Sequence, residues 1–183
     1  MECLIRTETP EDFAKVTEVL QSAFYRDDYD PEFNEWMLVE RIRSSLFYLP
    51  ELALVAAYNC LIVGHIMLTP MWIIDCNGVK YGSLALAPLA VHKDYQRQGI
   101  GTKLVQAAVN LAKDAGFKSI IVLGDPNYYQ RFGFQPAANW KIALEDEYNP
   151  HLMALELVEG SLNGISGNVK YCPPFYSTAG ELI

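Results

Sequence analysis

Apolar residues recur at helical spacing in two stretches of the chain, residues 13–24 and residues 104–115, and each stretch predicts an amphipathic helix. Thr9, followed by a proline and two acidic residues, is typical of a helix start before the first stretch. Gly116 is typical of a helix end after the second. A third helix is predicted over residues 32–47, where the apolar pattern is more mixed.

Runs of aliphatic and β-branched residues predict strands at 4–6, 52–58, 61–74, 79–83, 84–91, 119–123 and 153–158. Pro88 lies inside one of these runs and has no N–H group, so a bulge or a local separation from a neighbouring strand is expected there. A strand, a loop, a helix and a strand follow one another over residues 84–123, which predicts a parallel β-α-β unit. The fold class is therefore α/β.

Length and composition narrow the class of protein. The chain has 183 residues, of which 51% are apolar, so we expect one folded domain. We expect a soluble, cytoplasmic protein, because no apolar run reaches the roughly 18 to 20 residues of a membrane span and residues 1–6 do not resemble a signal peptide. A net charge of −8 argues against a nucleic-acid partner. The four cysteines are scattered without metal-ligand spacing, so we expect reduced thiols and no metal site.

A glycine-containing loop, residues 96–101, lies between a predicted buried strand and a predicted helix start. Glycines let a ligand approach the backbone, and free N–H groups with the helix dipole favour phosphate. The dinucleotide pattern G-x-G-x-x-G fails, because Leu104 stands where the third glycine is required. The nucleotide P-loop also fails, because Thr102 rather than lysine follows the second glycine. The loop therefore predicts a phosphate-containing ligand of another kind.

Two segments carry a resemblance to a known family. Gln96-Arg97-Gln98-Gly99-Ile100-Gly101 resembles the Q/R-x-x-G-x-G/A signature of the GNAT superfamily of N-acetyltransferases, and Tyr129-Gln130-Arg131-Phe132-Gly133-Phe134 resembles its Y-x-x-x-G-F segment. The stretch that contains the second motif is similar to a branch of predicted acetyltransferases with a GDPxYYxRFGF segment. The resemblance is clearest over residues 84–136.

The resemblance implies a single-domain GNAT fold, with a mixed, mostly antiparallel sheet whose fourth and fifth strands splay apart. It implies an N-acetyltransferase domain over residues 1–158 and a C-terminal extension over residues 159–183 that packs on it. Acetyl-CoA is the expected co-substrate, without a metal, and a primary amine of a small molecule or a peptide is the expected acceptor. The alternative, from another class of function, is a non-catalytic acyl-CoA-binding sensor or interaction module. A monomer and a homodimer both remain open.

The resemblance also implies roles for individual residues. The backbone of the fourth strand is expected to contact the pantetheine arm, and the loop to contact the pyrophosphate. The expected cofactor-binding residues are Leu89, Ala90, Val91, Gln96, Arg97, Gln98, Gly99, Ile100, Gly101, Thr102 and, as a weak substitute for the usual asparagine, Asn127. Tyr129 is the expected catalytic acid that protonates the leaving thiolate, with Tyr128 as its neighbouring alternative.

A general base is not identified. Deprotonating a lysine-like amine near pH 7 costs about 4 to 5 kcal/mol, so a base or a water chain must help. His65 and His92 are candidates because histidine as a residue type titrates in a suitable range, although a lone histidine beside a strand is more often structural. We favour a water-relayed base or an acceptor that is already neutral.

An acidic segment after the first predicted helix lies where the family builds its acceptor side. It either attracts a cationic amine or is simply a solvated loop. Its acidic residues are Asp27, Asp28, Asp30, Glu32 and Glu35.

Overall fold

The computed structural model describes residues 3–26 and 34–182, which form four α-helices and nine β-strands. The fold is α/β with mixed strand pairing, as predicted. The chain divides into two compact units, and strands β3 (Leu61–Ile74) and β4 (Lys80–Val91) and helix α3 (Ile100–Asp114) each contribute residues to both. Unit 1 contains residues 1–68, 87–111 and 173–183, and unit 2 contains residues 69–86 and 112–172.

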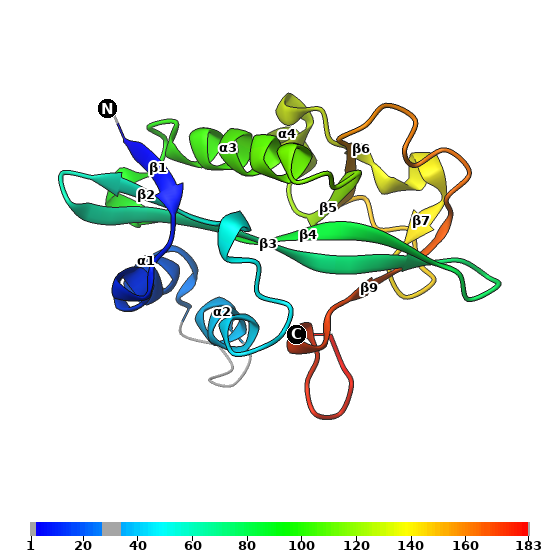
Figure 1. Cartoon of the computed structure of the whole chain (residues 1–183), viewed down its shortest axis with the longest axis horizontal. Helices are drawn as coiled ribbons and strands as arrows, with labels where there is room; N and C mark the ends of the chain where they lie inside the picture. The colour runs from blue at the N-terminus through cyan, green and yellow to red at the C-terminus, as the bar shows by residue number, and fades with distance from the viewer. Residues whose placement is uncertain (1–2, 27–33, 183) are drawn as a thin grey trace. The chain divides into compact units, whose positions relative to one another are not determined.

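Unit 1 has a sheet with helices on both sides. Strand β1 pairs antiparallel with β2, and β2 pairs antiparallel with the first part of β3. Figure 1 shows α1 and α2 on one side of these strands and α3 on the other. The elements are β1 (Leu4–Thr7), α1 (Phe13–Phe24), α2 (Glu35–Arg43), β2 (Ala53–Tyr58), β3 (Leu61–Ile74) and α3 (Ile100–Asp114).

Gly64 allows α3 to approach strand β3 closely. A Cβ atom at this position would lie 3.0 Å from the side chain of Leu104 and 3.2 Å from that of Ile100. Both residues are buried in the first turns of α3. Because side chains alternate between the faces of a strand, the neighbouring His65 faces the side of α1 and α2.

The predicted start of the first helix is confirmed. The N–H group of Thr9 donates to the carboxylate of Asp12 over 2.9 Å, and a single 3₁₀ turn at Pro10–Asp12 precedes α1. This reciprocal contact satisfies donors that a helix start leaves without partners.

Helix α2 is shorter than predicted. Its described start is capped by Asn34, whose side chain accepts from the N–H group of Met37 over 2.9 Å. At the other end the hydroxyl of Ser45 donates to the carbonyl of Ile42 over 2.8 Å. This local bond satisfies a terminal carbonyl, so the helix ends at Arg43 instead of continuing to residue 47.

Unit 2 is built on strand pairs of both directions. The first part of β4 runs parallel to β5, which pairs antiparallel with β8, and β8 pairs with β6. The second part of β3 pairs with β9, which runs parallel to β7. The strands are β4 (Lys80–Val91), β5 (Ser119–Leu123), β6 (Gln135–Pro136), β7 (Ile142–Ala143), β8 (Leu152–Glu156) and β9 (Gly167–Tyr171).

Strand β4 joins the two predicted strands 79–83 and 84–91 into one. Its described ladder with β5 consists of the pairs Leu84–Ile120 and Ala85–Ile121. The ladder therefore ends before Pro88, as expected from a residue that cannot donate a backbone hydrogen bond.

Glycines end two helices, and the first of these ends, at Gly116, was predicted. Gly116 has φ +85°, and the N–H group of Phe117 donates to the carbonyl of Ala112 over 3.1 Å at the end of α3. Helix α4 (Pro126–Tyr129) continues as a 3₁₀ turn that stops at Gly133, where φ is +90°.

The C-terminal residues contribute to both units. Strand β9 belongs to unit 2, whereas the 3₁₀ turn Pro173–Phe175 belongs to unit 1, where the Nε atom of Arg41 donates to the carbonyl of Pro174 over 3.1 Å. The division into a domain over residues 1–158 and an extension over residues 159–183 stays a prediction.

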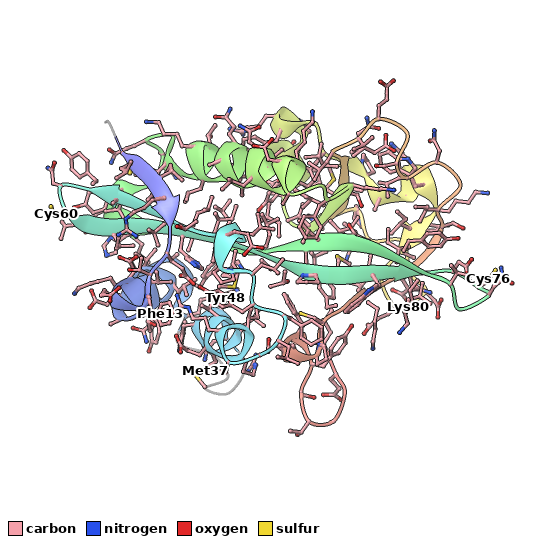
Figure 2. All side chains as sticks on the ribbon, viewed as in Figure 1. Phe13, Met37, Tyr48, Cys60, Cys76 and Lys80 are labelled. Atoms are coloured by element: carbon pink, nitrogen blue, oxygen red, sulfur yellow. The ribbon has the colours of Figure 1, made fainter. Side chains whose placement is uncertain are left out.

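All four cysteines are free thiols. Cys3 and Cys172 are buried, whereas Cys60 and Cys76 are exposed at the turns before and after β3 (Figure 2). In the part of the chain that the structure describes, no helix is long and apolar enough to span a membrane, and no cluster of side chains suits a metal ion.

Candidate functional site

The loop between β4 and α3 is held at both ends by hydrogen bonds in unit 1. The N–H group of His92 donates to the carbonyl of Val63 on β3 over 2.9 Å. The side-chain amide of Gln96 donates back to the carbonyl of Val91 over 3.0 Å. Gln96 therefore closes the loop against the end of β4. It is a predicted cofactor residue whose amide is used locally.

The backbone of the loop needs two left-handed residues, Arg97 with φ +59° and Gly99 with φ +81°. Helix α3 starts directly afterwards at Ile100, and the earliest of its N–H groups with a backbone acceptor is that of Lys103, which donates to Gly99 over 3.1 Å. Within residues 3–26 and 34–182, the N–H groups of residues 100–102 have no backbone acceptor. This is the donor set that binds anions at helix N-termini.

The space in front of the loop is open. A Cβ atom at Gly99 would meet nothing within 4 Å, and Arg97 and Gln98 are exposed. Among the described residues the Arg97 guanidinium has no carboxylate partner within 4.0 Å. A pyrophosphate fits this arrangement, because an exposed cation lies beside backbone N–H groups without backbone acceptors at a helix start.

The three predicted residues on β4 come directly before this loop. Ala90 is buried, and Leu89 and Val91 are half-buried. Together with Thr102, which is also half-buried, they form with the loop one continuous segment of unit 1.

Tyr129 and Asn127 lie in unit 2, on α4. Tyr129 is 8% exposed, and its ring packs edge-on against Tyr128 and Phe134, with centroid distances of 5.1 and 5.5 Å. Gly124 lies against the same ring, so a side chain there would collide with it. Burial raises the pKa of Tyr129. The phenol is therefore protonated near pH 7 and is able to donate.

Tyr128 is placed differently from Tyr129. Its ring is half-buried under the guanidinium of Arg131, which lies 4.8 Å from the ring centroid.

The side-chain amide of the exposed Asn127 donates to the carboxylate of Asp125 over 3.2 Å, so it is engaged within α4 and its cap. Tyr129 has no hydrogen-bond partner for its hydroxyl among the described residues. The role of Tyr129 as the proton donor stays a prediction.

The two candidate histidines occupy contrasting places. His92 is half-buried, its Nδ1 atom accepts from the N–H group of Asp94 over 3.4 Å, and its ring packs edge-on against Tyr95 at 5.8 Å. His65 is completely buried. Its Nε2 atom lies 3.1 Å from an oxygen of Glu8.

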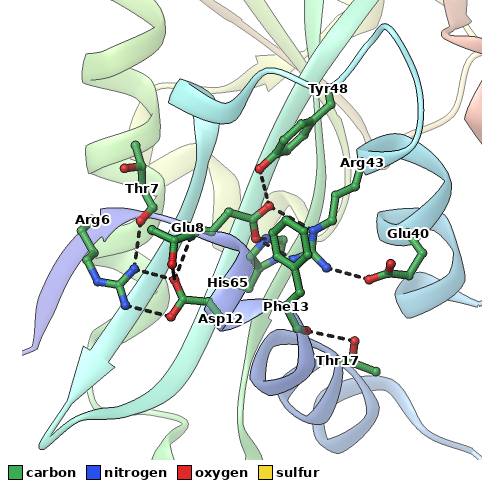
Figure 3. Close-up of polar contacts among 11 residues, drawn as sticks. Arg6, Thr7, Glu8, Asp12, Phe13, Thr17, Glu40, Arg43, Tyr48 and His65 are labelled. Carbon is green, nitrogen blue, oxygen red and sulfur yellow. Dashed lines mark hydrogen bonds and ion pairs between the residues drawn. The ribbon is translucent and has the colours of Figure 1, made fainter.

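Glu8, Arg43, Tyr48 and His65 form a buried polar group that is called the Glu8 cluster below (Figure 3). Arg43 donates twice to the carboxylate, over 2.6 and 3.1 Å, and the Tyr48 hydroxyl donates over 2.8 Å. The Arg43 guanidinium also lies 3.8 Å from the ring centroid of Phe13 on α1. The cluster thus links α1, α2 and the sheet of unit 1.

Burial shapes the ionisation of this cluster. Desolvation opposes the charge on Glu8, but hydrogen bonds from His65 and Arg43 outweigh it and lower the pKa of Glu8 to about 2. Desolvation lowers the pKa of His65. Glu8 is therefore ionised and His65 neutral near pH 7.

The Glu8 cluster was not predicted from the sequence. Glu8 and Arg43 are 35 positions apart, and no spacing rule connects a residue after a short strand with one at a helix end.

Four residues of the predicted acidic segment lie outside the described residues: Asp27, Asp28, Asp30 and Glu32.

Glu35, the fifth residue of the predicted acidic segment, is described. It is half-buried in the first turn of α2, and burial raises its pKa.

Comparison with known proteins agrees with this geometry. Residues 13–134 match the model of the acetyltransferase (GNAT) family. The uncharacterized N-acetyltransferase YhbS of Escherichia coli (strain K12) is 30% identical over 174 residues, which cover 92% of this chain and 95% of YhbS. The uncharacterized N-acetyltransferase YjhQ of the same strain is 37% identical over 94 residues, half of each chain.

Solved structures are similar over nearly the whole chain. The crystal structure of Escherichia coli YhbS in complex with CoA has a TM-score of 0.82 and 29% identity, and covers 96% of this chain and 92% of YhbS. A GNAT family acetyltransferase from Brucella melitensis in complex with acetyl-CoA has a TM-score of 0.76 and 28% identity. The match covers 95% of this chain and 98% of the Brucella chain.

The fold and the loop thus define a class, the acyltransferases that use acetyl-CoA as co-substrate. The chain belongs to the GNAT family of acetyltransferases.

Proposed function

We propose that the chain transfers the acetyl group of acetyl-CoA to a primary amine by direct attack, with the pyrophosphate bound at residues 97–102. The observation that carries the proposal is the start of α3, where backbone N–H groups without backbone acceptors lie beside the exposed Arg97. In this proposal the backbone of Leu89, Ala90 and Val91 contacts the pantetheine arm.

The proposed chemistry needs two proton movements. The amine loses a proton and its nitrogen forms a bond to the thioester carbon, while the carbon–sulfur bond breaks. The leaving thiolate takes a proton from the hydroxyl of Tyr129. The resulting tyrosinate then takes up the proton that the nitrogen loses on acetylation. Burial raises the pKa of Tyr129, so the phenol carries its proton and is present as a hydrogen-bond donor before the thiolate forms.

The acceptor is proposed as an amine of a small molecule or of a peptide. We further propose that the protein works in the cytoplasm as a monomer or homodimer. The net charge of −8 supports a cationic acceptor over a nucleic acid, because an acidic protein attracts amines and repels phosphate backbones.

An acceptor-panel assay tests the proposal. The purified chain is mixed with acetyl-CoA and a series of alkylamines, aminoglycosides and short peptides, and the release of CoA thiol is followed. The proposal expects acetyl-CoA-dependent thiol release and an acetylated amine by mass spectrometry. Tight CoA binding without turnover of any amine would instead support a non-catalytic acyl-CoA sensor.

The role of Tyr129 is tested by a matched pair of variants. Tyr129→Phe is expected to lower kcat by about 100-fold, the lower end of general acid catalysis, without weakening CoA binding. Tyr128→Phe removes the neighbouring phenol and is expected to change kcat by much less. Equal effects of the two variants would refute the assignment.

A further inference from the structure

His65 has one ring nitrogen that is paired and one that is not. Its Nε2 atom lies 3.1 Å from Glu8, whereas its Nδ1 atom is buried without a hydrogen-bond partner in the part of the chain that the structure describes. The side chain is completely buried on β3. A buried polar atom without a partner is costly, so it is a signal of function where it occurs.

The charge on Glu8 decides which nitrogen carries the proton. An ionised carboxylate accepts hydrogen bonds and cannot donate, so the proton of the neutral ring lies on Nε2 and points at Glu8. The Nδ1 atom then carries a lone pair. A carboxylate that orients a histidine through one nitrogen and leaves the other as a base is the arrangement of known catalytic pairs.

The rest of the Glu8 cluster holds this pair in place. Arg43 and Tyr48 together donate three hydrogen bonds to the Glu8 carboxylate, and Arg43 is itself held by Glu40 over 2.7 Å. The ring of His65 therefore has a fixed partner on a rigid support, which a merely space-filling histidine does not need.

His65 also lies next to the strand that the proposed function assigns to the cofactor. Strand β3 is the hydrogen-bonded neighbour of β4, and the bond from His92 to Val63 pins the end of β4 two residues from His65. Residues 84–91 contain no carboxylate that might act as the base.

We infer that His65, oriented by Glu8, is the proton acceptor at the end of a water relay that deprotonates the acceptor amine. This inference rests on the proposed function. The ammonium group of the amine gives a proton to water, the water gives a proton to Nδ1 of His65, and the neutral amine then attacks. The imidazolium later returns the proton to solvent, so no co-reactant is needed.

Several charged groups set the resting state of His65. The carboxylate of Glu8, in the segment after β1, contacts the ring of His65 directly. Arg43 on α2 and Tyr48 in the segment after α2 bond to that carboxylate, and Glu40 on α2 bonds to Arg43. Arg43 and burial oppose a second positive charge, whereas Glu8 favours it. The ring is therefore neutral before each turnover. It lies next to the Glu8 carboxylate, which stabilises the imidazolium when it forms.

The test compares two amines in one variant. His65→Gln keeps an amide donor toward Glu8 and removes the base. At pH 7 the variant is expected to lower kcat/KM about 100-fold for a strongly basic alkylamine, which is protonated, and far less for a weakly basic amine, which is neutral. CoA affinity, measured by calorimetry, is expected to match the wild type.

Tyr48→Phe is the matched control, because it removes one hydrogen bond to Glu8 and leaves the base in place. Its effect is expected to be equal for the two amines. An equal loss for both amines in His65→Gln, with turnover retained by the wild type, would refute the relay and leave the proposed function intact. Absence of turnover by the wild type with every amine would overturn the proposed function, and the relay with it.

The wild type decides the question if His65→Gln does not fold. The relay predicts that kcat/KM for the strongly basic amine is level near pH 7 and falls only at a pH below 6.5, the ordinary pKa of histidine, because burial lowers the pKa of His65 and the base becomes protonated only there. The weakly basic amine is expected to show no such decline while it remains neutral. The same decline for both amines would contradict the inference.

Discussion

The loop before α3 and the Glu8 cluster both bring charge into unit 1, yet they treat it in opposite ways. At the loop, an exposed arginine lies beside backbone donors without backbone acceptors. In the Glu8 cluster, Arg43 and the carboxylate are buried and bonded to each other, and the Nδ1 atom of His65 is left over. The loop is therefore open to an anion from solvent. The Glu8 cluster already contains an anion, the carboxylate of Glu8.

This difference separates binding from stability. Donors without partners at the loop contribute little to folding, because water satisfies them when no ligand is bound. The net contribution of a buried ion pair to folding stability is small, but removing one partner is destabilising because it leaves an unpaired charge inside the protein. Changes at the loop should therefore alter ligand affinity, and changes at the cluster should alter folding.

Glu8→Ala is expected to produce the largest effect. It leaves Arg43 buried without its main partner, and the free energy of unfolding should fall by about 3 to 5 kcal/mol, measured by urea denaturation. Glu18→Ala breaks the exposed pair with Lys15 and serves as the control, with almost no change expected. A loss no greater than that of the control would show that the cluster is not a stabilising unit.

Acid should weaken the fold through the same cluster. The pKa of Glu8 is lowered from 4.5 to about 2, so its contribution is complete above pH 4.5 and is lost as pH falls toward 2, a loss of up to about 3 kcal/mol. The lowered pKa of His65 acts in the same direction below pH 6.5, because folding favours the neutral ring. Between pH 7 and pH 3 the free energy of unfolding should depend less on pH in Glu8→Gln than in the wild type. The same pH dependence in both proteins would contradict the assignment.

Gly99→Asp should affect ligand binding instead. The side chain adds bulk and a negative charge where the pyrophosphate is proposed to bind, and CoA affinity should fall by about 100-fold in calorimetry. Gly78→Asp is a matched control, because Gly78 has φ +80° and open space, as Gly99 has φ +81° and open space. The control should carry the same backbone strain and leave affinity unchanged.

Arg97→Ala is expected to give the smallest effect, a loss of CoA affinity of about tenfold that shrinks at high salt. Lys93→Ala removes the same charge from an exposed position before the loop and controls for general electrostatic attraction. Equal losses in both variants would mean that Arg97 makes no specific contact.

Local rules predicted most of the fold. The helix start at Thr9, the helix end at Gly116 and the break before Pro88 each follow from one or two residues whose backbone chemistry is restrictive. The end of α2 was predicted too late, because the bond from Ser45 to Ile42 competes with a helix pattern that the apolar residues alone do not end.

The two regions differ in how far the sequence predicted them. The loop is a contiguous motif, so its residues and its ligand class were read directly from residues 96–101. The partners in the Glu8 cluster come from α2, β3 and two connecting segments, and they meet through tertiary packing that periodicity does not encode. His65 was noticed as a candidate base, but its carboxylate partner became visible in the folded chain.

The central claim is that the donors at the start of α3 bind the pyrophosphate of acetyl-CoA. An NMR titration of the ¹⁵N-labelled chain with CoA tests it directly, because each backbone N–H group reports its own environment. CoA is expected to cause the largest shifts at residues 97–102, and adenosine, which carries no phosphate, is expected to cause much smaller ones. Saturable CoA binding that leaves the N–H signals of residues 97–102 unchanged would contradict it.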